Sequence, residues 1–135
     1  MPPKTSFVLD TSALLALRGD EPGADRVEAL LSQAKRNQCR LLASFMSRME
    51  VLYTVWRAEG EEAARHALRL MDSFVVEWVS CEPKILEIAS RVKAHRRISV
   101  ADSWIAATAV AHGATLVHKD PEFSPHKEIP QEILR

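Results

Sequence analysis

The sequence has no apolar run that approaches the roughly 18 residues of a membrane span, so a transmembrane protein is not expected. Its 2 cysteines, Cys39 and Cys81, lie far apart and form no CxxC motif. A disulfide framework and a thiolate zinc site are therefore both excluded. Residues 1–4 are followed by only a short apolar stretch, because Asp10 interrupts it. We accordingly expect no signal peptide, no membrane partner and a cytoplasmic location.

An excess of charge of either sign is also missing. The chain carries 18 Lys and Arg residues against 18 Asp and Glu residues. No overall field would draw it onto nucleic acid, so a polyanion would have to be held by a local patch or through bound cations. Repeats, low-complexity segments and linkers are absent, and 47% of the residues are hydrophobic. We predict a single domain, residues 1–135, with one substantial core.

Short apolar runs alternate with amphipathic segments, which is typical of an α/β fold. We predict strands over residues 6–9, 40–44, 74–79 and 115–117. We predict helices over residues 12–18, 22–36, 47–59, 61–72, 83–95 and 100–112, with Pro22 in a first turn and Ser47 and Ser99 as caps. Helices that separate buried strands imply crossover connections. The expected fold is a three-layer α/β/α sandwich with a short, mainly parallel central sheet.

The helix predicted to begin at Ser47 has one apolar face. At helical spacing, this face is shared by Met49, Leu52, Tyr53 and Trp56. The spacing of all three tryptophans is typical of core or interface residues rather than of platforms for stacked bases; they are Trp56, Trp78 and Trp104. The predicted helices within 22–36 and 47–72 carry more apolar surface than a small sheet can cover. The excess would form a dimer face or a groove for a partner helix.

Four acidic residues are expected to meet at one edge of this sheet. Asp10 and Asp120 each follow a predicted strand, and Glu50 lies in the first turn expected after strand 40–44. Asp102 begins the helix that leads into the last predicted strand. In a parallel sheet, strand ends and the starts of the following helices share the carboxyl edge, where ligands bind.

Gathering carboxylates is unfavourable unless a cation compensates their charge. Oxygen ligands suit Mg²⁺ or Mn²⁺ better than zinc. Two such ions, roughly 3.5–4 Å apart, would activate a water and stabilise the leaving oxygen of a phosphodiester. The four acids therefore predict a metal site suited to phosphodiester hydrolysis.

Each acid also has a structural explanation. Ser47 with Glu50, and Ser99 with Asp102, have the spacing of a capping box, in which the acid bonds back to the cap backbone. Asp120 precedes a proline and has the pattern of a turn. Asp10 is flanked by apolar residues, where burial is expected. Separate structural roles would not explain why all four acids are expected at the same edge of the sheet. The set as a whole therefore favours the metal site.

At these residues the chain resembles the PIN-domain family. Residues 9–15, the helix with Glu50, residues 99–107 and residues 116–123 are similar to its acidic motifs in order and spacing, over essentially the whole chain. Small single-domain PIN proteins of this length are similar to the VapC-type ribonuclease toxins of type II toxin-antitoxin systems. This resemblance implies a PIN-like fold, Mg²⁺- or Mn²⁺-dependent cleavage of RNA, a homodimer and a cognate antitoxin.

The resemblance also implies roles for individual residues. Asp10, Glu50 and Asp102 become metal ligands and catalytic acids, with Asp120 as a more variable fourth acting directly or through water. Ser12 would orient a carboxylate or a metal-bound water. Glu122 is close enough to replace or support Asp120, so the fourth ligand stays open. His118 departs from the family pattern, which has Thr or Ser at that position.

Positive side chains near the acids are candidates for contacts with substrate phosphates. By sequence the nearest are Arg96, Arg97, His118 and Lys119. For the two arginines, a solvated loop or a helix end is an equally good interpretation.

Two other functions remain open. One is a PIN-fold nuclease of RNA processing without an antitoxin, and the other is a non-catalytic PIN-fold binding or regulatory module. An aspartyl phosphohydrolase is disfavoured, because it needs an acid two residues after Asp10, where this chain has Ser12.

Overall fold

The structure is a computed structural model that describes residues 4–135. Residues 1–3, which begin the predicted domain and the segment considered for a signal peptide, lie outside the described residues. A sheet of five strands, all neighbours parallel, has the order β3-β2-β1-β4-β5. The strands are β1 (Ser6–Leu9), β2 (Arg40–Ser44), β3 (Glu77–Val79), β4 (Thr115–His118) and β5 (Gln131–Ile133).

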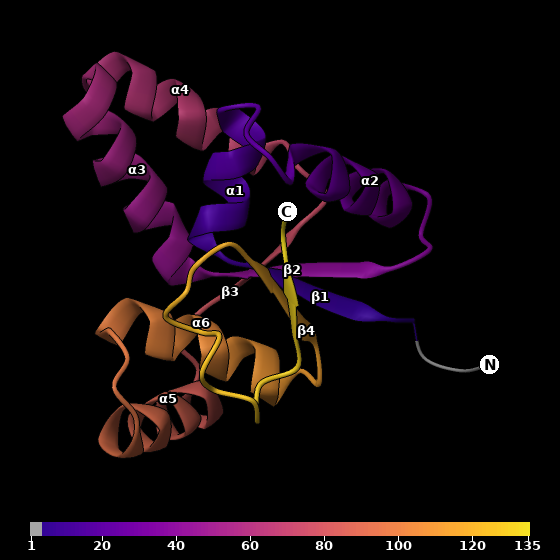
Figure 1. The fold of residues 1–135 in the computed structure, drawn as a ribbon. Helices are drawn as coiled ribbons and strands as arrows, with labels where there is room; N and C mark the ends of the chain where they lie inside the picture. Colours follow the sequence, from indigo (N-terminus) through magenta and orange to yellow (C-terminus); the bar gives the residue numbers. More distant parts are fainter. Residues whose placement is uncertain (1–3) are drawn as a thin grey trace.

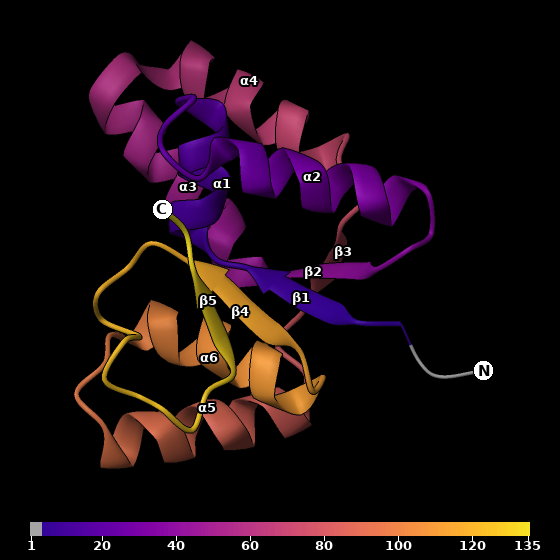
Figure 2. The ribbon, with the colours of Figure 1, turned by 45° about the vertical axis from the view of Figure 1, so that its right-hand side comes forward.

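Helices cover both faces of the sheet (Figure 1). They are α1 (Thr11–Arg18), α2 (Ala24–Lys35), α3 (Phe45–Glu59), α4 (Glu61–Asp72), α5 (Pro83–His95) and α6 (Val100–Ala111). Figures 1 and 2 show α1 to α4 on one side of the sheet and α5 and α6 on the other. The predicted three-layer α/β/α sandwich is confirmed. No helix within residues 4–135 is both long enough and apolar enough to cross a membrane.

Alternation along the central strands creates a core on each side of the sheet. Leu9 and Val117 are fully buried in the cluster beneath α1 to α4. Their chain neighbours Val8 and Leu116 are fully buried in the cluster with α5 and α6. Successive side chains of a strand point to opposite faces, so consecutive apolar residues supply both cores. This double burial fixes the strand ends from which the site is built.

The first two helices begin at residues other than those predicted. α1 starts at Thr11, because Asp10 is its N-cap and accepts a hydrogen bond from the Ala13 N–H. α2 starts at Ala24 after Gly23, whose φ of 101° suits glycine. Pro22 therefore lies before this helix rather than in its first turn.

The apolar face predicted for α3 is not the face that is buried. Ser44 rather than Ser47 caps the helix, and the buried face consists of Ser47, Val51 and Val55, spaced four residues apart. Met49 is 64% exposed and Trp56 is 41% exposed. The predicted face, which also includes Leu52 and Tyr53, has large apolar side chains at helical spacing. It nevertheless points largely outward.

The outer strands also differ from the prediction. β3 has only three residues instead of the six of 74–79, because a turn joins the Val76 N–H to the Phe74 carbonyl. β5 was missed: its sequence, Gln131-Glu132-Ile133, has too little apolar character to indicate a strand.

Candidate metal centre

The candidate site lies at the carboxyl edge of the sheet, where α1, α3 and α6 begin and the loop after β4 passes them (Figure 2). Asp10 follows β1 directly, and Asp120 lies two residues beyond β4. Asp102 lies in the first turn of α6. Glu50 is the sixth residue of α3, so it lies in the second turn and not in the first turn as predicted.

Asp10 is 2% exposed, and two donor groups bind its carboxylate. The Ala13 N–H donates to Oδ1 over 2.8 Å, and the Ser12 hydroxyl lies 2.8 Å from both carboxylate oxygens. Ser12 Oγ in turn accepts the Lys119 N–H over 2.9 Å. Burial raises the Asp10 pKa to about 7, despite the opposing effect of these hydrogen bonds. Ser12 thus ties the start of α1 to the chain leaving β4 and orients a carboxylate that is costly to ionise.

Glu50 does not form the alternative capping box. Ser44 caps α3 by accepting the Met46 N–H over 3.2 Å. The Glu50 carboxylate instead accepts the Thr11 hydroxyl over 2.6 Å, and Thr11 Oγ1 also lies 3.0 Å from Ser47 Oγ. These contacts direct Glu50 toward the start of α1, beside Asp10. The sequence showed a hydroxyl next to Asp10 but gave no indication that Thr11 reaches across to α3.

Asp102 does not complete the capping box, because Glu122 accepts the hydrogen bond that the acid of the box would accept. The Asp102 N–H donates to Ser99 Oγ over 3.1 Å, which is half of the box. The Ser99 N–H, which the acid of a complete box would bind, donates to Glu122 instead. The Asp102 carboxylate is therefore not used to cap its own helix.

Asp102, Asp120 and Glu122 form a compact acidic group. One carboxylate oxygen from each lies within 4.8 Å of the other two. The turn interpretation of Asp120 is correct in part, since its Oδ1 accepts the Glu122 N–H over 2.9 Å. This turn brings Glu122 beside Asp102 as well. Both candidates for the fourth ligand are thus in position.

Negative charge in this group is not compensated by basic side chains. Asp102 is 6% exposed. Its pKa is raised to about 9, first by burial, then by a hydrogen bond to Glu122 and by the negative charge of Asp120. Within residues 4–135, the ion pairs of Lys and Arg involve none of Asp10, Glu50, Asp102, Asp120 or Glu122. Clustered oxygen ligands without a basic partner are the donor set that Mg²⁺ or Mn²⁺ fits.

The predicted four acids do not form one equivalent set. Among the described residues, Asp10 and Glu50 do not join the compact group of three carboxylates. Asp10 is nevertheless near enough to Asp120 for its pKa to be raised by that charge. The structure therefore has a tight group on the side of α6 and a second pair, Asp10 and Glu50, linked through the start of α1.

Of the predicted phosphate contacts, His118 is wrong. His118 is fully buried, and both its ring nitrogens are engaged within the protein. Lys119 remains at the edge of the site, with its Nζ 3.5 Å from Glu21. Arg96 pairs with Glu128 over 3.0 Å, and Arg97 is exposed.

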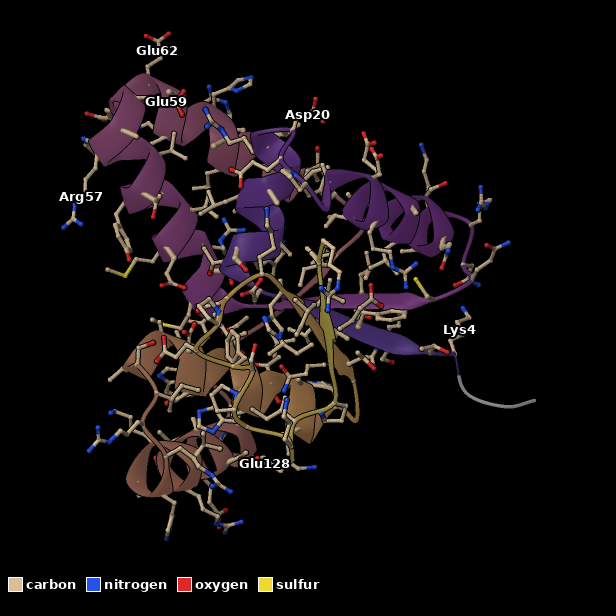
Figure 3. The ribbon with its side chains drawn as sticks, in the orientation of Figure 1. Lys4, Asp20, Arg57, Glu59, Glu62 and Glu128 are labelled. Atoms are coloured by element: carbon tan, nitrogen blue, oxygen red, sulfur yellow. The ribbon has the colours of Figure 1, made fainter. Side chains whose placement is uncertain are left out.

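Arg57, another basic residue of α3, lies near the carboxyl-terminal end of the helix. Figure 3 shows Arg57 pointing outward near the end of α3 that lies away from the acidic group.

The family model described as "PIN domain" matches residues 7–128. The chain belongs to the PIN domain family. None of the curated proteins matches its sequence at a significant level.

Solved structures share the fold over most of the chain. The structure of VapBC2 from Rickettsia felis bound to a DNA fragment from their promoter has a chain 21% identical to this one, with a TM-score of 0.76, covering 97% of this chain and 100% of that chain. VapBC-1 from nontypeable Haemophilus influenzae is 20% identical, with a TM-score of 0.71 and coverage of 96% and 98%. VapC20 from Mycobacterium tuberculosis, described as a Sarcin-Ricin loop cleaving toxin, is 19% identical, with a TM-score of 0.69 and coverage of 89% and 94%.

Proposed function

We propose that this protein is a cytoplasmic, Mg²⁺- or Mn²⁺-dependent endoribonuclease and the toxin of a toxin-antitoxin pair. The observation that carries the proposal is the group of three close carboxylates, one buried and two partly buried, without basic partners at the carboxyl edge of a PIN fold. Keeping such a group in a folded protein is unfavourable without a cation, so its presence favours a metal-dependent reaction. Similarity to a structure described as a Sarcin-Ricin loop cleaving toxin supports RNA as the substrate.

A bound Mg²⁺ or Mn²⁺ would lower the pKa of a water and neutralise charge that develops on the phosphoryl oxygens. Asp10, Asp102 and either Asp120 or Glu122 would hold the ion, with Glu50 completing the set. One of these acids would accept the proton of the attacking water. Ser12 would keep Asp10 oriented through the hydrogen bond described above. No serine or cysteine nucleophile is needed.

Substrate phosphates would contact the basic residues beside the acids. Lys119 directly precedes Asp120, and its ion pair with Glu21 is partly exposed. An exposed ion pair contributes little stability, so a phosphate could displace Glu21 at small cost. Arg97, exposed in the segment before α6, would be a second contact.

A cognate antitoxin is the proposed protein partner. One similar structure is described as a toxin-antitoxin complex, and another as a member of the VapBC family of toxin-antitoxin systems. An apolar cavity of about 310 Å³ lies among α1, α2 and α4, with Leu14, Leu17, Leu31, Leu70 and Phe74 in its lining. Such a cavity suits the apolar face of a partner helix. The outward apolar residues Met49, Tyr53 and Trp56 of α3 would contribute to a homodimer face.

The test is cleavage of a pool of structured and single-stranded RNA in Mn²⁺, Mg²⁺ or EDTA. Wild-type protein should cut RNA only with a divalent ion, and Asp10→Asn should lose this activity, because asparagine preserves the helix cap but removes the charged ligand. Asp25→Asn, at an exposed position in α2, is the matched control and should cut normally. Both variants and wild type should first be checked for freedom from a co-purified partner.

The other outcomes are informative. Equal cutting by wild type and Asp10→Asn would indicate a contaminating ribonuclease. Mn²⁺ binding without cleavage would contradict the nuclease assignment and favour a binding module.

A further inference from the structure

His118 is a buried polar residue whose hydrogen bonds indicate which ring nitrogen donates and which accepts. The ring is 0% exposed. Its Nδ1 lies 3.1 Å from the backbone nitrogen of Asp120, and that N–H can only donate. Nδ1 must therefore accept, which leaves the proton on Nε2. Nε2 then donates to Gln131 Oε1 over 2.9 Å. One ring thus connects the end of β4 to β5 and to a candidate metal ligand.

Gln131 extends this connection across the loop between β4 and β5. With Oε1 accepting from His118, its Nε2 faces three backbone carbonyls of the loop: Phe123 at 3.2 Å, His126 at 3.0 Å and Ile129 at 3.3 Å. The loop, residues 119–130, contains no helix or strand. Backbone hydrogen bonds form turns within the loop, and the Gln131 side chain adds bonds that join these turns to one another.

The Phe123 ring completes the packing around this pair. Phe123 is fully buried, and its ring meets the His118 ring edge-on, with centroids 5.1 Å apart. A buried histidine in such surroundings has an ordinary explanation as a satisfied core residue. The difference here is that its acceptor nitrogen binds the backbone of Asp120 itself.

The chain of contacts continues from Asp120 into the acidic group. Asp120 Oδ1 accepts the Glu122 N–H, and the Glu122 carboxylate accepts the Ser99 N–H at the start of α6. Moving the Asp120 backbone would therefore shift two of the three carboxylates of the compact group. Supporting residues of this kind set the orientation, and thereby the affinity, of metal ligands.

We infer that His118 and Gln131 are a positioning pair that holds the loop 119–130, and with it Asp120 and Glu122, in the geometry needed to bind a divalent cation. This inference rests on the proposed function for the role of the cation. The lock on the loop itself follows from the contacts alone.

Two variants separate the bonds of His118. In His118→Gln, the new amide lies near the place of Nε2, so the bond to Gln131 can persist while the acceptor for the Asp120 N–H is lost. In His118→Asn, the amide oxygen lies near the place of Nδ1, so the bond to Asp120 can persist while the bond to Gln131 is lost. Val27→Ala is a control for general destabilisation. Val27 is fully buried on α2, in the core on the opposite side of the sheet from His118.

Two measurements test the pair. In metal-free protein, hydrogen exchange at the Asp120 amide should be at least about tenfold faster in His118→Gln than in wild type and nearly unchanged in His118→Asn. In calorimetric titrations with Mn²⁺, His118→Gln should bind at least about tenfold more weakly, and His118→Asn should recover most of the affinity. Val27→Ala should leave the exchange rate of the Asp120 amide and the Mn²⁺ affinity within about twofold of wild type. This should hold even if it lowers the melting temperature more than the His118 variants do.

The outcomes separate this inference from the proposed function. Wild-type exchange and affinity in His118→Gln would overturn the positioning pair, as would equal losses in Val27→Ala. Failure of wild-type protein to bind Mn²⁺ would overturn the proposed function, and the exchange of Asp120 would then decide whether the loop is locked.

Discussion

Replacing Asp102 with asparagine is expected to reduce metal-dependent RNA cleavage by about a thousandfold. A bound cation supplies several kcal/mol of transition-state stabilisation, and about 4 kcal/mol corresponds to a thousandfold in rate. Asp102 is the buried member of the compact group and interacts with both of the other carboxylates, so its loss should weaken cation binding most. Single-turnover cleavage at saturating Mn²⁺ measures the effect, with Asp25→Asn as the control at an exposed site.

The same substitution should stabilise the metal-free protein. Asparagine resembles the protonated form of Asp102 and can still donate to Glu122, whereas it carries no charge that burial would penalise. Releasing even one unit of the pKa shift corresponds to about 1.4 kcal/mol of unfolding free energy. Thermal unfolding in EDTA should therefore show a melting temperature higher by several degrees. Loss of both stability and activity would identify Asp102 as a structural acid instead.

The opposite responses of activity and stability depend on features that the sequence revealed only in part. The ends of β1 and β4 could be predicted because short apolar runs define them, and Asp10 and Asp120 follow from those ends. The parallel topology then placed both residues at one edge. Burial of strand residues on both faces leaves little freedom in where such strands end.

Local motifs were less informative than topology. Ser99 and Asp102 have the spacing of a capping box, but Glu122 supplies the carboxylate that closes the cap. A contact over 23 residues cannot be read from a local pattern. Ser47 and Glu50 do not form a capping box either. Strand β2 ends at Ser44, and this residue directly caps α3.

The missed elements have a common physical cause. β5 is short and polar, and its role depends on Gln131, whose hydrogen bonds are all formed after the loop has folded back onto β4. His118 at the end of β4 could be recognised as unusual, but its partner 13 residues later carried no signal. Tertiary hydrogen bonds of single polar residues have no periodicity, so their positions are not predictable from sequence patterns.

Metal-free protein should lose stability as the pH rises, and Mn²⁺ should reverse this loss. The pKa of Asp10 is about 7 and that of Asp102 about 9 in the folded protein, against an ordinary value of 3.8 for an aspartate. Between these limits the folded state binds more protons than the unfolded state, so unfolding releases protons and the free energy of unfolding falls with pH. The slope is about 1.4 kcal/mol per pH unit for each extra proton bound.

Chemical denaturation in EDTA between about pH 5 and pH 8 measures this slope. The double variant Asp10→Asn, Asp102→Asn should have a flatter profile, and its difference from wild type isolates these two acids from the histidines that titrate in the same range. Identical profiles would mean that both acids ionise in the folded protein without penalty.

Mn²⁺ should have the reverse pH dependence, because a cation binds the ionised carboxylates and must displace their protons. Near pH 5 it should stabilise wild-type protein little. Near pH 8, at about a hundredfold excess over the dissociation constant, it should add about 2.7 kcal/mol to the free energy of unfolding. The double variant should show neither effect. Stabilisation by Mn²⁺ that is independent of pH, or that persists in the double variant, would place the cation elsewhere on the protein.

Proton release on Mn²⁺ binding, measured in buffers of different ionisation enthalpy, should rise as the pH falls from about 8 toward 6, because the fraction of protonated Asp10 increases over that range.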